Sequence, residues 1–507
     1  MVRLIEQSNV DSEIFTSKKV ICFGTGKRFH FFREMWPQIS VSGLIDNYKC
    51  GSFLDLNGKS VLIWSPEEAA HYIDTDSIII ITSIRVEEIV AQLDQIEELN
   101  GIFCYAEAAL DNYAGLSVEQ KLHLERLIPL LAQRTPAEAL LGDYGWLNQT
   151  ADIKKYQIWH YLGMYNTAGN KAKEDIKRIA GALGYQVMNV HFSTGEAGTE
   201  VADLSDKLVY SDWEAVLQRV PCQSLLLLQM PMQTRFPMDL ILQMKEKKDL
   251  RFITVVHDVD MLRKLENYIT REDEFKFMLE VSDCLIVHNE EMVQYFKQIG
   301  INPEKLISLQ IFDYLHDEPE TEKIFERAVI FAGNLSAQKS PFVYELGKLT
   351  SMKVYLYGSY FSGDLLSQVD NVVYGGSILA DFLPQKLDRG FGLIWDGDSI
   401  NTCSGDTGEY LRYNNPHKMS LYLASGLPVV IWNSAAQARF VEENGVGVVI
   451  DSLYSLHDVL AQISEKDYRV FIQNVQRISE QLKSGHYMRT ALKKAEKAVY
   501  ITGHVGR

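Results

Sequence analysis

The chain has 507 residues and a formal net charge of −17, with 46% hydrophobic and 23% charged residues. This composition is typical of a globular protein with enough apolar material for roughly two to four domains. The acidic balance argues against nonspecific nucleic-acid binding, which needs clustered Lys and Arg. The six cysteines are scattered and form no C-x-x-C pair, so we expect neither a disulfide framework nor a zinc site.

No targeting or membrane-spanning segment is visible in the sequence. The N-terminal stretch MVRLIEQSNVDSEIF has no apolar core of the kind that a secretory signal needs. The most apolar runs, SIIIIT and SLLLLQM, have the length of strands and are far shorter than the ~20 residues of a spanning helix. Together with the cysteine usage, this indicates a protein of the reducing cytoplasm.

Short apolar runs recur along the whole chain. In order they are KVICFG, SIIIITS, SLLLLQ, FITVVH, CLIVHN, AVIFAG, KVYLYG, GLIW and PVVIW. Such continuous runs are typical of parallel strands buried on both faces, and amphipathic helical patterns lie between many of them. The alternation predicts a doubly wound α/β architecture that is repeated more than once.

We divide the chain into five parts. They are a Rossmann-like domain at 1–112, a helical connector at 113–150, an α/β domain at 151–325, a second α/β domain at 326–485 and a C-terminal helix at 486–507. Two consecutive α/β domains of this size predict two Rossmann-like domains that face each other across a cleft. Ligands in such sheets bind outside the carboxyl ends of the strands, so the loops after the strands are the place to look for a site.

The first domain carries a glycine turn after its first strong strand. Gly24-Thr25-Gly26-Lys27 precedes a helix, and a later strand ends at Asp46. A glycine turn before a helix can hold a phosphate, but the third glycine of G-x-G-x-x-G is missing. Two interpretations stay open here, a dinucleotide-type site and a tight structural turn.

The second α/β part offers polar residues on two segments. The loop NTAGN, Asn166 to Asn170, precedes an amphipathic helix that we expect to stop near Gly184. His257, Asp258 and Asp260 follow the buried strand FITVV, where a carboxylate or an imidazole can act as a general base on an attacking hydroxyl. The alternative is that one of the two aspartates caps the next helix.

Several strands of the third part end in glycine and small polar residues. These strand ends are Gly333-Asn334-Leu335-Ser336, Gly358-Ser359, Gly375-Gly376 and Asp396-Gly397-Asp398. Each alone is ordinary loop chemistry, but together they point to one polar crevice. Asp396 and Asp398 have a spacing that suits Mg²⁺ or Mn²⁺, yet we favour no metal because a lysine and a helix N-terminus already supply positive charge.

That lysine lies in the stretch LRYNNPHKMSLYLASGLPVVIW. We expect Asn415 to cap a helix whose first turn holds His417 and Lys418 and which stops at Gly426. A cation at a helix N-terminus is disfavoured by roughly 0.3–1 kcal/mol, unless an anion is bound there. The pattern therefore predicts a phosphate or diphosphate site, and the alternative is that Lys418 points into water and His417 packs.

These motifs resemble a group of bacterial GT-B glycosyltransferases. The segments VIFAGNLS, LRYNNPHKMSLYLASGLPVVIW, FITVVHDVDMLR, LIVHNEEM and LQIFDYL carry the resemblance, which covers roughly residues 155 to 495. The group includes the glucosyltransferases of streptococcal serine-rich adhesins and β-1,6-galactofuranosyltransferases. The first 112 residues fall outside it and look like the Rossmann-like domain fused to several sugar-transferring enzymes.

The resemblance implies a UDP-sugar donor on the third part and an acceptor on the second. The implied donor-binding residues are Gly333, Asn334, Leu335, Gly358, Asn414, Asn415, His417 and Lys418, and the implied acceptor-side residues are Asn166, Thr167 and Asn170. Many GT-B enzymes hold the ribose with a glutamate where this chain has Leu421. We expect Asn415 to take over that contact.

The function expected from these residues is transfer of a hexose from a UDP-sugar to a hydroxyl of a glycan or glycoprotein acceptor, with Asp258 and His257 as the catalytic residues. No cofactor and no metal are expected. The first alternative is a non-catalytic partner subunit that binds glycan or acceptor. A second alternative places redox or epimerase chemistry in residues 1–112, which the incomplete glycine pattern disfavours.

The basic tail RTALKKAEKAVY allows two interpretations. It either lies on an anionic membrane surface or packs back across the two α/β domains. We favour the second, and so expect a cytoplasmic protein, with peripheral attachment to the inner face of the membrane as the alternative. Related enzymes suggest a homo-oligomer.

Overall fold

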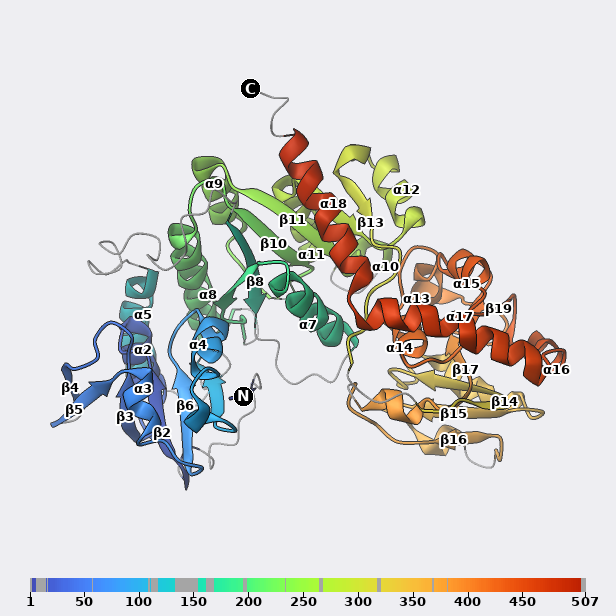
Figure 1. Ribbon diagram of the computed structural model, residues 1–507. Helices are drawn as coiled ribbons and strands as arrows, with labels where there is room; N and C mark the ends of the chain where they lie inside the picture. Colours follow the sequence, from blue (N-terminus) through green and yellow to red (C-terminus); the bar gives the residue numbers. More distant parts are fainter. Residues whose placement is uncertain are drawn as a thin grey trace. The chain divides into compact units, whose positions relative to one another are not determined.

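The computed structural model describes most of the chain as three sheets with flanking helices (Figure 1). The described residues are 2–5, 15, 17–56, 58–107, 110, 117–132, 154–160, 168–194, 198–232, 234–263, 268–316, 321–366, 369–380 and 382–502. The chain forms two compact units. Unit 1 consists of residues 1–165, 185–227 and 232–251, and unit 2 consists of residues 166–184, 228–231 and 252–507.

The N-terminal sheet lies in unit 1 and has seven strands in the order β1-β7-β6-β2-β3-β5-β4. The strands are β1 (Arg3–Ile5), β2 (Lys19–Phe23), β3 (Val41–Ile45), β4 (Phe53–Leu56), β5 (Lys59–Trp64), β6 (Ser77–Ile81) and β7 (Phe103–Ala106). The helices are α2 (Lys27–Met35), α3 (Pro66–Ala70), α4 (Val86–Leu93) and α5 (Val118–Ala132). Every residue of the inner strand β6 is buried, which explains its unbroken apolar sequence. Helix α5 lies in the predicted connector, of which residues 113–116 and 133–150 fall outside the described chain.

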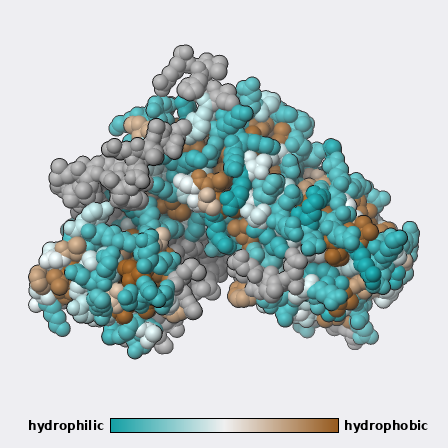
Figure 2. All heavy atoms as spheres, in the orientation of Figure 1, coloured by the Kyte–Doolittle hydropathy of each residue, from teal (hydrophilic) through white to brown (hydrophobic). Residues whose placement is uncertain are grey.

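Four strands of this sheet, β1, β4, β5 and β7, have no counterpart among the predicted strands. Strands β4 and β5 form an antiparallel hairpin at the sheet edge, in which Phe53 pairs with Leu62 and Leu56 with Lys59. The hairpin mixes polar and apolar residues because one of its faces is open to solvent. Figure 2 shows hydrophobic side chains gathered at this edge, where Phe53 and Leu62 are exposed.

The second sheet has six strands in the order β13-β12-β11-β10-β8-β9. The strands are β8 (Lys155–His160), β9 (Gln186–Val190), β10 (Leu225–Met230), β11 (Arg251–Val256), β12 (Cys284–Val287) and β13 (Leu306–Ser308). The helices are α7 (Ala168–Gly181), α8 (Glu200–Arg219), α9 (Met238–Lys248), α10 (Asp260–Arg263), α11 (Tyr268–Val281) and α12 (Glu290–Gln298). The predicted loop NTAGN is shorter than expected, because Ala168, Gly169 and Asn170 already belong to α7.

The third sheet also has six strands, in the order β16-β15-β14-β17-β18-β19. The strands are β14 (Ile324–Ala332), β15 (Lys353–Tyr357), β16 (Val372–Tyr374), β17 (Arg389–Ile394), β18 (Val429–Trp432) and β19 (Gly447–Ile450). The helices are α13 (Gly405–Tyr410), α14 (His417–Ala424), α15 (Ala438–Asn444), α16 (Leu456–Ala461), α17 (Glu465–Lys483) and α18 (His486–Thr502). Helix α17 begins at Ser464 with a capping box closed by Asp467.

These two consecutive six-stranded sheets confirm the predicted α/β class and the GT-B fold with a further Rossmann-like domain before it. The strand pairs within them are parallel, for example β14 with β15 and β17 with β18. Each of the nine apolar runs found in the sequence forms a strand. Their carboxyl ends carry the loops in which the sequence placed its candidate residues.

The C-terminal helix α18 packs within unit 2 against α7 and strands β12 and β13. Its buried face carries Met488, Leu492 and Val499, and its exposed face carries Lys493 and Lys497. The outer surface of this helix is correspondingly hydrophilic in Figure 2. The apolar face that a membrane-lying helix would need is therefore used in packing. In the described part of the chain, no helix combines the length and the apolar character needed to cross a membrane.

Candidate functional site

The loops after β14 and β15 bring several predicted residues together. Gly333 N–H donates to Tyr357 O at 3.0 Å, and Leu335 N–H donates to Ser359 O at 2.9 Å. Gly358 has φ +145°, and a Cβ on it would lie 1.7 Å from Gly333 O. Only glycine fits this close approach of two backbones. Because the Leu335 side chain is fully buried, this residue offers a ligand only its backbone.

The helix that carries Lys418 begins differently from the prediction. Helix α14 starts at His417, and its N-cap is Pro416, without a side-chain capping bond. The prediction that Asn415 caps the helix is therefore wrong. Asn415 is 2% exposed and its amide oxygen accepts hydrogen bonds from Asn289 and Gln437.

Asn415 instead ties the loop before α14 to the end of β12. Its backbone N–H donates to His288 Nδ1 at 2.8 Å, and its side chain donates to His288 O. With these partners the amide has no exposed acceptor for a ribose, which argues against that predicted role. The neighbouring Asn414 is half-buried as a residue, but its Oδ1 atom is buried and, within the described chain, accepts no hydrogen bond.

Lys418 already has an anionic partner in the protein. Its ammonium donates to Asp396 Oδ2 at 2.8 Å and to Trp395 O at 3.1 Å. It also lies 4.5 Å from the centre of the Phe331 ring. The carboxylate of Asp396 offsets the unfavourable position of a lysine at the start of a helix. Asp396, which the sequence offered only as half of a weak metal pair, is thus the counter-ion of Lys418.

Two further cations, which the sequence analysis missed, lie close to Lys418. Lys339 is exposed as a residue, but partial desolvation of its ammonium and the proximity of Arg263 and Lys418 lower its pKa, while Asp396 counters part of this effect. Arg263 forms an ion pair with Asp258 at 3.0 Å. We call Arg263, Lys339 and Lys418 the cation cluster. No ion pair of the Lys339 ammonium is found within the described residues.

His257 is held in one orientation at the end of β11. Its Nε2 lies 2.8 Å from Gln229 Oε1, and the Gln229 amide nitrogen donates to Lys173 O at 3.1 Å. This assigns the proton of the imidazole to Nε2 and leaves Nδ1 as an acceptor. Among the described residues, Nδ1 has no hydrogen-bond partner although it is buried.

The electrostatics around His257 favour its neutral form. Burial lowers the pKa of His257 well below 6.5, and the nearby ionisable groups of Lys173, His417 and His288 lower it further. Burial likewise lowers the pKa of His417 to about 4 and that of His288 to about 3. All three imidazoles are therefore neutral at pH 7 and surround Phe312, whose ring is parallel to that of His257 at 5.6 Å.

Asp258 and Asp260 both interact with Arg263. Asp260 is the first residue of α10, and its carboxylate lies 3.5 Å from the guanidinium of Arg263. The backbone N–H of Val259 donates to the Tyr410 hydroxyl at 3.0 Å. This bond connects the loop after β11 to α13. Asp258 is thus engaged with a cation, whereas His257 keeps an unused lone pair.

A buried lysine lies on α7 behind His257. Lys173 is 6% exposed, and its ammonium donates to Pro231 O at 2.7 Å. Burial lowers its pKa to about 8, and Glu274, Asp258 and Asp260 oppose the shift. Of the predicted acceptor-side residues, Asn170 is half-buried on the same helix, while Asn166 and Thr167 lie outside the described residues.

The glycine turn of the N-terminal sheet is filled by the protein itself. Thr25 donates to Asp46 Oδ2 from its backbone N–H at 2.9 Å and from its hydroxyl at 2.7 Å. The other oxygen of Asp46 accepts from the N–H groups of Tyr48 and Lys49. A carboxylate therefore occupies the position that a phosphate would take, which favours the structural turn over a dinucleotide-type site.

No group of three or more His, Cys, Asp or Glu within the described residues is arranged to hold a metal ion.

Comparisons with known proteins cover the second and third sheets. Residues 155–311 match the model described as Glucosyltransferase 3-like, N-terminal domain, and residues 329–495 match the corresponding C-terminal domain. Over 250 residues the chain is 36% identical to beta-1,6-galactofuranosyltransferase WbbI of Escherichia coli (strain K12). This alignment covers 48% of this chain and 70% of the relative. Over 324 residues it is 26% identical to glucosyltransferase 3 of Streptococcus gordonii, spanning 63% of this chain and 92% of the relative.

Among solved structures, sucrose-phosphate synthase from Thermosynechococcus elongatus aligns with a TM-score of 0.47 and 11% identity, covering 69% of this chain and 100% of that one.

Proposed function

Because the chain belongs to the glucosyltransferase 3-like family of glycosyltransferases, we propose that it transfers a hexose from a UDP-sugar to an acceptor hydroxyl. The acceptor is a glycan of a surface polysaccharide or of a glycoprotein. The observation that carries the proposal is the cation cluster: Lys418 lies in the first turn of α14, and the charges of Arg263 and Lys418 act on Lys339.

The cation cluster is the binding site for the diphosphate in this proposal. First-turn N–H groups have no partners inside the helix and point toward an anion bound at its end. Lys339 brings a charge that no carboxylate of the described chain pairs with directly, and Lys418 shares its charge with Asp396. The same groups stabilise UDP as it departs, because negative charge builds up on the diphosphate as the bond to the sugar breaks.

Next to the diphosphate, the loops after β14 and β15 hold the rest of the donor. The backbones of Gly333, Asn334 and Gly358 line its path. Because the Oδ1 atom of Asn414 is buried, its amide nitrogen is the group proposed to donate to a ribose oxygen. Asn414 thereby takes the role that the sequence suggested for Asn415.

His257 is the proposed base. Its Nδ1 atom is unprotonated at neutral pH and turned away from Gln229, so it accepts a hydrogen bond from a substrate hydroxyl. Asp258 acts on the reaction through its ion pair with Arg263, which places the guanidinium. Asn166, Thr167 and Asn170 stay the proposed acceptor-side residues.

We propose that neither a metal nor a cofactor takes part, because lysine, arginine and helix N–H groups supply the positive charge that a metal would bring. A cytoplasmic location and a homo-oligomeric state remain proposals. So does attachment to the inner face of the membrane, for which the exposed lysines of α18 are the available groups.

A donor panel tests the proposal. UDP-glucose, UDP-galactose, UDP-galactofuranose and UDP-GlcNAc are titrated into the full chain by calorimetry, and UDP release is followed over hours. We expect UDP and at least one UDP-sugar to bind and slow hydrolysis of that donor. A chain that binds no UDP contradicts the proposal. A chain that binds UDP-sugars but neither hydrolyses nor transfers them supports the alternative of a non-catalytic partner subunit.

A further inference from the structure

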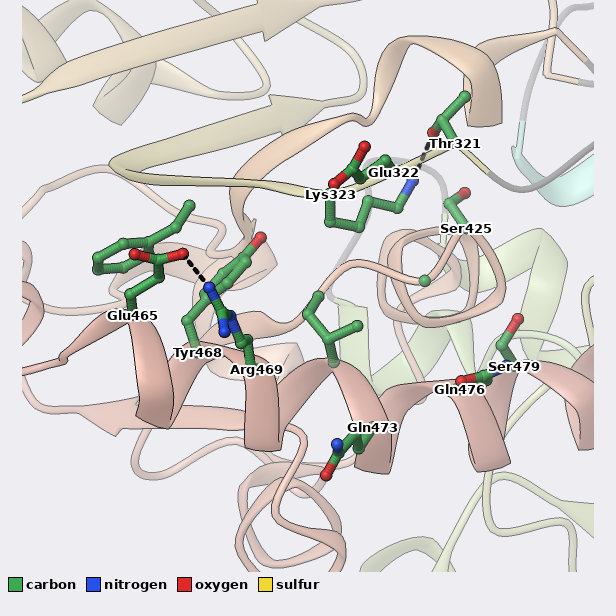
Figure 3. Close-up of a pocket in the computed structure, with 13 residues that line it drawn as sticks. Thr321, Glu322, Lys323, Ser425, Glu465, Tyr468, Arg469, Gln473, Gln476 and Ser479 are labelled. Carbon is green, nitrogen blue, oxygen red and sulfur yellow. Dashed lines mark hydrogen bonds and ion pairs between the residues drawn. The ribbon is translucent and has the colours of Figure 1, made fainter.

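A groove of about 490 Å³ lies between the start of β14 and helix α17 (Figure 3). One side is formed by Thr321, Glu322 and Lys323 at the start of β14, and the other by residues of α17. Ser425 and Gly426, at the end of α14, close it. The volume is within the range of roughly 300–1,000 Å³ in which small-ligand sites of proteins fall. We call this the rear groove.

The rear groove is separate from the proposed donor site. It borders the amino end of β14, whereas Gly333 and the cation cluster lie beyond the carboxyl end of that strand. It also lies at the opposite end of α14 from Lys418, which is about 12 Å along the helix axis at 1.5 Å per residue. A ligand in the rear groove would therefore not be the sugar that is transferred.

The charged side chains of the groove are balanced, and three of the four are engaged within the protein. Arg469 forms an ion pair with Glu465, and the Lys323 ammonium donates to Thr321 Oγ1 and Leu387 O, each at 2.8 Å. Figure 3 shows the Arg469–Glu465 and Lys323–Thr321 contacts on opposite sides of the groove. With two acids, Glu322 and Glu465, facing two bases, the groove does not select a strongly charged ligand.

The remaining polar side chains of the rear groove are of the kind that bind hydroxyl groups. Gln473 and Gln476 project from exposed positions of α17, and Glu322 is exposed on the opposite side. Within the described chain these three side chains form no hydrogen bond or ion pair with the protein. Amide and carboxylate groups together both donate and accept, as a ligand with several hydroxyls requires.

The floor of the groove is partly apolar. Phe325 and Ile472 are half-buried there, and Phe325 packs beside Tyr468 with 5.1 Å between ring centres. The Tyr468 hydroxyl donates to Gly390 O at 2.8 Å and its side chain is buried, so Tyr468 supports Phe325 from below and the apolar surface of the groove comes from Phe325 and Ile472. A pyranose has hydroxyls around its rim and C–H groups on its faces, and it matches a floor of this kind with hydrogen-bonding walls.

We propose that the rear groove is a second, non-catalytic saccharide site that holds a distant part of the glycan acceptor. The proposal rests on the proposed function for its ligand, since the acceptor there is a glycan. The rear groove would anchor the acceptor about one length of α14 away from Lys418. Such a site raises the local concentration of acceptor ends without taking part in the reaction.

Saturation-transfer NMR on the full chain tests the proposal. The probes are methyl β-glucoside, methyl β-galactoside, N-acetylglucosamine and lactose, each with UDP at saturation. The test variant is Gln473→Ala/Gln476→Ala, and Glu480→Ala on the same helix is the control, because both replace exposed residues by the best helix former. We expect at least one probe to bind the wild type and the control, and about tenfold weaker binding to the double variant.

Two results would overturn the rear-groove site: no probe binds the wild type, or the double variant binds as well as the wild type does. Lys418→Met separates this proposal from the proposed function, since it should lose UDP and keep the saccharide signal. If UDP fails to bind any variant while saccharide binding still depends on Gln473 and Gln476, the donor assignment falls and the rear groove stands.

Discussion

Two glycine turns in this molecule each follow a parallel strand, but the charged groups around them differ. Gly24 follows β2 in the N-terminal sheet, and Gly333 follows β14 in the third sheet. At the first turn, Asp46 accepts the N–H and hydroxyl of Thr25. Near the second, the cation cluster collects and Lys339 has no ion pair in the described chain.

The difference shows that a glycine turn after a parallel strand is not in itself a phosphate site. What decides is whether the protein supplies its own anion at that position. Charge changes in unit 1 should therefore alter stability and leave nucleotide binding alone, whereas charge changes at the cation cluster should do the reverse.

The largest effect is expected at His257. Replacing His257→Gln should lower turnover by about 10²–10⁴-fold, because the base is lost, while UDP affinity changes little. In the wild type the low pKa of His257 keeps its imidazole neutral, so turnover should stay level as the pH falls from 8 through 6.5. Steady-state rates across pH, with UDP titrations of both proteins, are the measurement. A rate loss in wild type with a midpoint near 6.5 would contradict the assigned base.

Lys339→Met should weaken UDP binding by about tenfold to a hundredfold, the usual effect of losing a charge-assisted hydrogen bond. Lys348→Met is the matched control, because Lys348 is an exposed lysine on the same lobe and pairs with Glu345 at 3.4 Å. Calorimetry of both variants compares them. If both variants lost the same amount of UDP affinity, the overall charge of the protein, and not the cation cluster, would attract the nucleotide.

Asp46→Ala tests the glycine turn of the N-terminal sheet. It removes the acceptor of four hydrogen bonds, so the free energy of unfolding should fall by about 1–2 kcal/mol. UDP affinity should not change, and wild type should bind no NAD(H). Urea unfolding and both titrations are the measurements. A clear NAD(H) affinity of the wild type would restore the dinucleotide interpretation of this turn.

The smallest effect is expected from deprotonation of His191, which is buried among charged side chains in unit 1. Burial disfavours the charged form of His191, but Asp212 and Glu107 outweigh it and raise its pKa from 6.5 to about 9. Arg28 pairs with the same two carboxylates. The stability due to this shift is complete below pH 6.5 and is lost as the pH rises through 9.

Thermal unfolding across that pH range checks the role of His191. As the pH rises through this range, we expect the thermal unfolding temperature of the wild type to drop by about 2–4 °C. His191→Asn should lose most of this pH dependence. UDP affinity should be the same for both proteins at every pH. An unchanged pH dependence in His191→Asn would show that the imidazole is not charged in the folded protein.

The fold could be read from the sequence because buried parallel strands leave unbroken apolar runs, of which β6 and β10 are examples. The β4–β5 hairpin was missed because an edge exposed on one face, with Asp55 and Lys59 in it, has no such run. Local patterns also located His257, Gly333, Gly358 and Lys418, each of which follows a strand or begins a helix.

The remaining features of the site depend on contacts between distant segments. Asn415 looks like a cap, but its hydrogen bonds reach His288 and Asn289, more than 120 residues earlier in the chain. The pairing of Lys418 with Asp396 and the neighbourhood of Lys339 and Arg263 likewise exist only in the folded protein. A lone lysine in a loop carries no local signal of such a role.

The central claim is that the tip of α14 binds the diphosphate of UDP. Calorimetric titration of UDP into wild type, Lys418→Met and Arg412→Met tests it most directly. Arg412 is the matched control, since it is a half-buried cation in the loop before α14 and pairs with Glu409 at 2.7 Å. We expect Lys418→Met to bind UDP at least about tenfold more weakly and Arg412→Met to bind like the wild type. Equal UDP affinity of wild type and Lys418→Met would contradict it.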